Sequence, residues 1–287
     1  MPEAPEMQAL AERLRDRIQG KTLERIDPLQ FSALKTFSPA HEELYGKPVT
    51  DVGRRGKYVD IVFGGPHILF HLSQGGRVDV EDEPKTTKPK GSVARFRFTA
   101  TPGETPGPPS GPAVLIKEYG TDRKAGWWVL AEGDIGPLSK LGPEPDSVEF
   151  AELIRTSTDA RRIHTLMRDQ RTVAGLGRGY TDDILHHAKL SPYSTLKTLK
   201  PDERERLVEA IGVVLEQGLE EERKRTGGLP TKIGDHWIVH NNWGRPCPAC
   251  GDDLRRVSYE SHEVAYCPTC QTGGKILADR RMSRLIR

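Results

Sequence analysis

The spacing of hydrophobic residues changes along the chain, and its first clear period is helical. Residues 5–19 carry apolar side chains three or four positions apart, with Glu and Arg between them, and Gly20 follows. This pattern predicts a half-buried helix that ends at the glycine. The apolar positions of this helix are Met7, Leu10, Leu14 and Ile18.

Short apolar runs bounded by turn residues come next. They lie at residues 58–63, 67–72, 93–98, 113–118 and 126–130. Runs of this length, separated by Gly and Pro, are typical of strands, and together they predict an antiparallel sandwich or barrel. Two inserts at 81–91 and 101–112 are rich in Pro, Gly, Lys and Thr, which predicts mobile loops.

Helical spacing returns after a proline-rich stretch at residues 137–147. Apolar residues lie at helical intervals in 148–155, 161–168, 182–188 and 202–225. Between the second and third of these helices, residues 173–180 read Val-Ala-Gly-Leu-Gly-Arg-Gly-Tyr. Glycines let backbone amides approach a phosphate closely, but such a turn also serves simply to connect two helices. Both roles stay open from the sequence.

The four cysteines of the chain form two Cys-x-x-Cys pairs near its end. The pairs are separated by 16 residues, and their members are Cys247, Cys250, Cys267 and Cys270. Two such pairs supply the tetrahedral sulfur shell that zinc prefers. Two disulfides would require an oxidising compartment, and no apolar signal segment is seen at the start. We expect one structural zinc ion, because four sulfur ligands leave no position for a reactive water.

These patterns predict an α+β multidomain protein. We expect an N-terminal β-sandwich domain with flanking helices at 1–136, a linker at 137–147, a helical domain at 148–238 and a zinc finger at 239–287. With 287 residues, the chain is long enough to bury a full core without metal.

Positive charge is concentrated locally although the formal net charge is only +2. Residues 161–178 contain five arginines and one aspartate, and residues 239–287 contain eight basic and five acidic side chains. An anionic polymer is the natural partner of such patches, although ordinary solvated faces look similar. No apolar run approaches the roughly 18 residues of a membrane span, so we expect a cytoplasmic protein.

The amino terminus, Met-Pro-Glu-Ala-Pro-Glu, carries a second candidate chemistry. Removal of Met1 would leave Pro2 with a secondary amine, which titrates near pH 8 and is partly unprotonated at neutral pH. Attack on an aldehyde or a sugar C1′ gives an iminium ion that withdraws electrons from neighbouring carbons. Glu3 is close enough in sequence to transfer the protons involved. A proline at position 2 is more often just a tolerated end, so these six residues alone decide nothing.

The order of the motifs resembles the formamidopyrimidine-DNA glycosylase and endonuclease VIII family over nearly the whole chain. The similarity rests on the Pro-Glu-x-Pro-Glu start, the Arg-Arg-Gly-Lys-Tyr strand entry at 54–58, His-Leu-Ser-Gln-Gly-Gly at 71–76, the glycine turn ending at Tyr180, and the four cysteines. This resemblance implies base-excision repair, with a β-sandwich domain, a helix-two-turn-helix domain and a zinc finger that bind DNA. It also implies a monomeric bacterial protein associated with the nucleoid.

Residue roles follow from the resemblance, position by position. Pro2 matches the nucleophile, Glu3 the acid/base residue and Glu6 the second carboxylate of the motif. Lys57 matches a lysine that holds phosphate beside the damaged nucleotide. The DNA-binding positions it implies are Gln74, Arg123, Lys124, Arg178 and His262.

Several DNA-contact positions depart from the family pattern. Arg178 replaces an asparagine, and His262 replaces an arginine of the finger hairpin. Gln74 is followed by two glycines and no apolar wedge, and Ala125 stands where an aromatic residue would stack on the opposite base. Residues 217–237, where family members carry a loop over the extruded base, are unusually charged.

These departures suggest three hypotheses about function. The first is a glycosylase and abasic-site lyase that excises damaged bases through a Pro2 Schiff base and cleaves the strand by β/δ elimination, with altered lesion choice. Abasic, bulky, cross-linked or single-stranded lesions are its candidate substrates. The second is a damaged-DNA-binding protein with little or no catalysis, and the third is a zinc-ribbon factor acting on RNA.

Overall fold

The computed structural model describes residues 1–99, 111–119, 123–229, 235–259 and 262–278. The chain divides into two compact units. Unit 1 contains Met1–Ser139 and Glu221–Ile233, and unit 2 contains Lys140–Glu220 and Gly234–Arg287. None of the described helices has the length and apolar character needed to cross a membrane.

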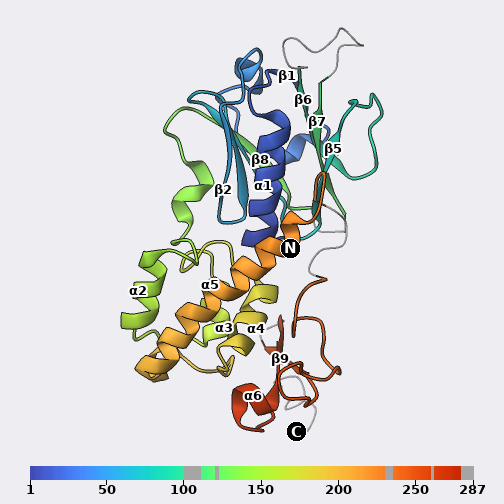
Figure 1. Ribbon diagram of the computed structural model, residues 1–287. Helices are drawn as coiled ribbons and strands as arrows, with labels where there is room; N and C mark the ends of the chain where they lie inside the picture. Colours follow the sequence, from blue (N-terminus) through green and yellow to red (C-terminus); the bar gives the residue numbers. More distant parts are fainter. Residues whose placement is uncertain (100–110, 120–122, 230–234, 260–261, 279–287) are drawn as a thin grey trace. The chain divides into compact units, whose positions relative to one another are not determined.

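Unit 1 is built on two four-stranded antiparallel sheets (Figure 1). The first has the order β1-β6-β7-β5 and the second β2-β3-β4-β8. Residues from both sheets share one hydrophobic core, which confirms the predicted sandwich. The strands are β1 Leu23–Asp27, β2 Asp51–Arg55, β3 Tyr58–Val62, β4 His67–His71, β5 Gly76–Glu81, β6 Ser92–Phe98, β7 Ala113–Glu118 and β8 Gly126–Leu130.

Helix α1 (Ala4–Ile18) packs against β2 and β3 of this sandwich. Its predicted apolar positions are all fully buried, so the helical period located the correct face. Pro5 lies in the first turn, where its missing N–H costs no helical hydrogen bond. Two short 3-10 helices, η1 Phe31–Ala33 and η2 His41–Leu44, follow β1.

Within the sandwich of unit 1, the strand predictions were correct for five runs but missed three described strands, β1, β2 and β5. β1 (Leu-Glu-Arg-Ile-Asp) contains three charged residues, β5 alternates charged residues with valines, and β2 contains Gly53 and two arginines. These strands bury only some of their positions, so they lack a continuous apolar run. The predicted loop at 81–91 also begins one residue too early, because Glu81 belongs to β5. Most of the other insert, residues 101–110, lies outside the described part.

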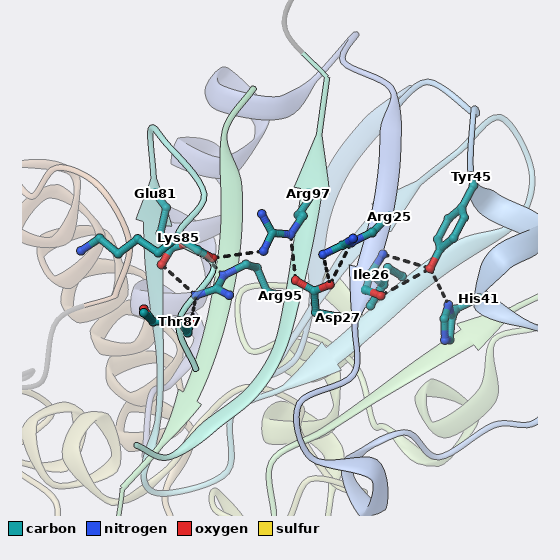
Figure 2. A network of polar contacts seen from close by, with 10 residues as sticks. All are labelled: Arg25, Ile26, Asp27, His41, Tyr45, Glu81, Lys85, Thr87, Arg95 and Arg97. Carbon is teal, nitrogen blue, oxygen red and sulfur yellow. Dashed lines mark hydrogen bonds and ion pairs between the residues drawn. The ribbon is translucent and has the colours of Figure 1, made fainter. Parts of the chain in front are cut away.

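A polar network covers part of the first sheet (Figure 2). Arg95 on β6 is 1% exposed, and its guanidinium donates to both carboxylate oxygens of Glu81 and to the Thr87 carbonyl. Arg97 donates to Asp27 at 2.7 Å and to the Lys85 carbonyl at 3.1 Å. These bonds hold residues 85–87 against the sheet.

Unit 2 contains the helices predicted after the linker. They are α2 Val148–Thr156, α3 Ile163–Leu166, α4 Arg178–His187 and α5 Pro201–Arg223, with η4 Leu196–Thr198 before α5. The 3-10 helix η3 (Gly136–Lys140) precedes them, and all but its last residue belongs to unit 1. Helix α4 begins at Arg178, four residues before the predicted start at residue 182, because the end of the glycine turn is already helical. The last turn of α5 belongs to unit 1.

The carboxy-terminal part of unit 2 contains a two-stranded antiparallel hairpin and a short helix. They are β9 Arg255–Tyr259, β10 His262–Tyr266 and α6 Pro268–Thr272. A separate small core of Val239, Leu254, Cys247 and Cys267 lies beneath them. The hairpin, α6 and the cysteines belong to the same unit as helices α2 to α4. The predicted boundary between a helical domain and a zinc finger at 238/239 stays a prediction.

Candidate functional site

The amino terminus lies against buried carboxyl groups in unit 1. Pro2 and Glu3 are buried, and Glu3 is the N-cap residue of α1. The Glu3 N–H donates to Glu6 Oε2 at 2.9 Å. This bond satisfies an amide that the helix itself leaves unpaired, and it fixes the backbone next to Pro2.

Charges of both signs surround the terminal amine. The chain carries Met1, and burial lowers the pKa of the Met1 amine; Glu3 opposes this shift, whereas Lys57 and Arg77 add to it. A lowered pKa increases the unprotonated fraction of an amine, which is the nucleophilic form. Removal of Met1 transfers the free amine to Pro2, one residue along this buried segment.

Glu6 is fully buried and keeps its proton at neutral pH. Burial, with the nearby charges of Glu3 and Glu222, raises the pKa of Glu6 to about 8. Among the described residues, Glu6 Oε1 has no hydrogen-bond partner. The neutral carboxyl group of Glu6, with one oxygen that makes no hydrogen bond, can therefore donate a proton inside the site.

Lys57 is 4% exposed in the turn between β2 and β3. Gly56 before it has a φ of 56°, a conformation that glycine adopts without strain. On β4, His71 lies opposite Tyr58, and burial together with Lys57 lowers the pKa of His71 to about 4. The imidazole is therefore neutral, and its Nδ1 accepts the Ser73 N–H at 3.2 Å. Sequence reasoning gave no role to His71.

The turn that carries Gln74 leads from β4 into β5. Gln74 is exposed, and Ser73 before it has a positive φ of 53°. The Arg77 guanidinium donates to the Gly76 carbonyl at 2.6 Å, which anchors the turn from the strand that follows. Arg77 therefore acts on both the turn and the terminal amine, a role that was not predicted from the sequence.

Arg123 and Lys124 are exposed on the segment before β8. The backbone N–H groups of Lys124 and Ala125 donate to Glu118 Oε1 at 2.8 and 2.9 Å. Ala125 is buried, so this position offers no stacking surface. Residues 121 and 122 of the same motif lie outside the described part.

In unit 2, the glycine turn leads directly into α4. Gln170 holds the turn from one side, because its Oε1 accepts the Gly175 N–H at 2.9 Å and its Nε2 donates to the Leu176 carbonyl at 2.7 Å. Arg178 is exposed at the first position of α4. Backbone N–H groups at such a helix start favour anions, and an arginine adds a charge that matches phosphate.

Gly179 explains part of the glycine pattern. A Cβ at this position would lie 2.4 Å from the indole ring of Trp237. The third glycine of the turn therefore makes room for a tryptophan that precedes the cysteine module. Gly175 instead has a φ of 90°, which a residue with a side chain rarely adopts.

Two neighbouring carboxylates of α4 hold the segment before the cysteines. Asp183 accepts the backbone N–H groups of Ile238, Val239 and His240. Asp182 Oδ2 lies 2.6 Å from His240 Nδ1, and burial raises the pKa of Asp182 to about 6 although His240 opposes the shift. The cysteine module is thus attached to the helix that begins at Arg178.

The four cysteine sulfurs form one cluster whose ligand atoms all lie within 4.8 Å of each other. The Cys247–Cys270 and Cys250–Cys267 sulfur pairs are 3.9 and 3.4 Å apart. Four sulfurs at about 2.3 Å from one zinc ion would be about 3.8 Å apart, so the donor set fits tetrahedral zinc. His186 Nε2 lies 3.2 Å from Cys247 Sγ, where it can orient this ligand as a hydrogen-bond donor.

His262 is the first residue of β10, paired with Tyr259. The hairpin tip at 260–261 lies outside the described part, so the predicted contact of His262 stays a prediction. The structure thus brings Pro2, Glu3, Glu6 and Lys57 together in unit 1. Arg178 and the cysteines belong to unit 2.

Comparison with known proteins identifies matching domains in both units. The formamidopyrimidine-DNA glycosylase N-terminal domain matches residues 1–106, and the H2TH domain of the same enzymes matches residues 141–228. Formamidopyrimidine-DNA glycosylase of Thermus thermophilus is 30% identical over 292 residues, which cover 96% of this chain and 100% of that protein.

Other similar proteins include a shorter relative and solved structures. A formamidopyrimidine-DNA glycosylase-like protein of Mycobacterium tuberculosis, named as uncharacterized, is 43% identical over 154 residues, 51% of this chain and 94% of that protein. Lactococcus lactis Fpg with abasic-site DNA has a TM-score of 0.78 at 22% identity, covering 94% of this chain and 99% of that one. MutM with DNA containing carbocyclic 8-oxo-G has a TM-score of 0.78 at 23% identity, covering 94% and 100%. These structures show the same fold. The full-length relative and the two matching domains establish that the chain belongs to the formamidopyrimidine-DNA glycosylase family of DNA glycosylases.

Proposed function

We propose that this protein is a DNA glycosylase with abasic-site lyase activity whose nucleophile is the amine of Pro2. The buried position of the amino terminus between Glu3, Glu6, Lys57 and Arg77 supports this proposal most directly. Burial and two neighbouring cations favour the unprotonated amine, and the carboxyl groups supply proton transfer beside it. Lys57 provides positive charge for a phosphate next to the reacting sugar.

The reaction begins when the Pro2 nitrogen attacks the sugar C1′ of the damaged nucleotide. A C1′–N bond forms, the bond to the base breaks, and the base leaves with a proton. Glu3 protonates the ring oxygen as the sugar opens, which gives an iminium ion between Pro2 and C1′. The iminium acidifies the C2′ hydrogens, so loss of a proton expels the 3′ phosphate, and a second elimination expels the 5′ phosphate. Water then hydrolyses the remaining adduct and frees Pro2.

The proposed DNA contacts are Gln74, Arg123 and Lys124 in unit 1 and Arg178 and His262 in unit 2. Buried Ala125 offers no aromatic surface for stacking, and Gln74 is polar. Stacking of a base on an aromatic side chain contributes about 1–3 kcal/mol. Without this stacking, the protein discriminates less between different bases opposite the lesion. We therefore assign to this protein a lesion choice shifted toward abasic, bulky, cross-linked or single-stranded sites.

The cysteine cluster would hold one structural zinc ion in this function. Cys247, Cys250, Cys267 and Cys270 would hold the ion, and zinc bound there would cross-link the two Cys-x-x-Cys segments and stabilise the β9–β10 hairpin that carries His262, a proposed DNA contact. The Asp182–His240 and Asp183 contacts attach this module to α4. The protein is proposed to act as a monomer on the bacterial chromosome.

Borohydride trapping on a panel of damaged oligonucleotides tests the proposed function. A covalent adduct with abasic-site DNA is expected, because reduction fixes the iminium to Pro2. Pro2→Gly should retain a weak primary-amine reaction, and Glu3→Gln should reduce base removal more than strand cleavage. Absence of an adduct with every substrate would contradict the proposal.

The alternative, a binding protein without turnover, depends on the state of the amino terminus. Retained Met1 would block the Pro2 nitrogen, and Met1 as a whole residue is 44% exposed. Mass spectrometry of the purified protein distinguishes the two states. Retained Met1, salt-dependent DNA binding and no adduct would together favour the alternative.

A further inference from the structure

Glu118, the last residue of β7, holds the segment before β8 through its side chain. Its Oε1 atom accepts the backbone N–H groups of Lys124 and Ala125 at 2.8 and 2.9 Å. Glu118 is 2% exposed and Ala125 is also 2% exposed, so water has little access to these two bonds. The side chains of Arg123 and Lys124 on the same segment are exposed. Glu118 therefore fixes the backbone from which two cations extend.

The two carboxylate oxygens of Glu118 are used unequally. Oε1 accepts both N–H groups, whereas Oε2 has no hydrogen-bond partner among the described residues. A single acceptor oxygen, such as the one that glutamine also carries, is therefore enough for this contact. Without an acceptor, the two N–H groups would lack a partner, and the segment would have to move toward water to regain one.

The backbone around Glu118 is itself fixed by neighbouring segments. The Glu118 N–H donates to the Gly91 carbonyl at 2.8 Å. The next residue, Tyr119, donates its N–H to the Gly75 carbonyl at 3.0 Å, in the turn that carries Gln74. The end of β7 thus holds this turn through its backbone and the segment before β8 through the Glu118 side chain.

We propose that Glu118 is a positioning residue for DNA binding: its Oε1 atom keeps the backbone before β8 in place, so that the exposed side chains of Arg123 and Lys124 meet DNA phosphates. This inference rests on the proposed function, which makes this segment a DNA contact. Guanidinium and ammonium groups bind phosphate, and they bind it more tightly when their backbone needs no ordering on contact.

The salt dependence of DNA binding separates this role from a general loss of stability. Each neutralised phosphate adds about 0.9 to the slope of log K against log salt concentration, and unfolding part of a sample leaves this slope unchanged. Glu118→Met fills a similar volume without an acceptor. It should weaken binding about tenfold and reduce the slope by about one to two. Glu118→Gln keeps an acceptor and should bind as wild type.

Fluorescence anisotropy of the full-length, zinc-loaded protein measures affinity and slope. The probe is a duplex with a reduced abasic site, which cannot form an iminium ion. Lys124→Ala keeps its backbone N–H and removes only the cation, so it should lower the slope by about one, with little further effect in Glu118→Met. Glu43→Met is the matched control, because Glu43 Oε1 holds the Ala40 N–H at 2.8 Å away from the proposed DNA contacts. It should change neither affinity nor slope.

Thermal unfolding identifies any variant that does not fold. If Glu118→Met fails, Glu118→Asp takes its place, because it keeps the charge but its shorter side chain cannot reach both N–H groups; the same loss of slope is expected. Amide hydrogen exchange gives a direct check. The N–H groups of Lys124 and Ala125 should be protected in wild type and in Glu118→Gln, and should lose protection in the variant without the contact.

The outcomes distinguish this role from the proposed function. Wild-type protein that does not bind the duplex would overturn both. Binding without a borohydride adduct on abasic-site DNA would overturn the function of Pro2, and the binding measurements would still decide the role of Glu118. An unchanged slope in the folded variant without the contact, an equal loss in Glu118→Gln, or additive effects with Lys124→Ala would overturn the role of Glu118 alone.

Discussion

Gly75 lies so close to Tyr119 that a Cβ on the glycine would be 1.9 Å from the Tyr119 carbonyl oxygen. The Tyr119 N–H also donates to the Gly75 carbonyl at 3.0 Å. The turn that presents Gln74 is therefore pressed against the backbone that follows β7, and the double glycine after Gln74 has a steric cause.

Gly75→Ala is expected to displace this turn and lower trapping about tenfold, with a stability loss of about 1–3 kcal/mol from overpacking against rigid backbone. Urea unfolding and borohydride trapping measure the two effects. Gly53→Ala is the matched control, because no heavy atom lies within 4 Å of a Cβ there. Equal behaviour of the two variants would contradict the steric argument.

Glu6 should make the protein less stable as pH rises. Its folded pKa of about 8 lies above the ordinary value of 4.5, so the folded state holds a proton that the unfolded state has released between these limits. Its contribution to stability is complete below pH 4.5 and is lost as pH rises toward 8, by at most about 1.4 kcal/mol per pH unit.

Glu6→Gln should flatten this dependence, because the amide remains neutral at every pH. Urea unfolding at a series of pH values measures the slope. Exposed Glu209→Gln on α5 should leave the slope as in wild type. A slope that persists in Glu6→Gln would assign the effect to another group.

Metal analysis should find one zinc ion per chain, bound by the four cysteines. Removal by a chelator, or Cys270→Ser, should unfold the hairpin and abolish DNA binding, since metal-site formation and folding are coupled in small modules. Near-ultraviolet circular dichroism and DNA titration measure these losses. Excess zinc should reverse the chelator effect but not that of Cys270→Ser; full hairpin signal without metal would contradict a structural zinc site.

Arg95→Met should destabilise the protein by about 3–5 kcal/mol, because it leaves Glu81 as a nearly buried charge without its guanidinium. Arg97→Met should cost less, since Arg97 and Asp27 keep more solvent contact, with side chains 12% and 18% exposed against 1% and 9% for Arg95 and Glu81. Urea unfolding ranks the two. Adding Glu81→Leu to Arg95→Met should recover stability, and failure to do so would show that packing dominates over charge.

Much of the fold could be predicted from local pattern. Met7, Leu10, Leu14 and Ile18 gave the buried face of α1, because helical period and burial are both local properties. Strands β1 and β5 were not predicted, because they carry charged residues that pair with charged residues on neighbouring strands. An example is Asp27 on β1, which accepts a hydrogen bond from Arg97 on β6. That pairing depends on residues 70 positions apart and leaves no local signal.

The candidate site shows the same division. The sequence by itself determined the reactive groups, namely a proline amine, two carboxylates, a lysine and four thiols, since spacing and residue type define their chemistry. Tertiary structure alone decided that Glu6 is fully buried and that its pKa is raised to about 8, with burial as the largest cause and the charges of Glu3 and of Glu222, more than two hundred residues away, adding to it. The physical reason is that burial and through-space charge set protonation, and both depend on which distant segments fold against one another.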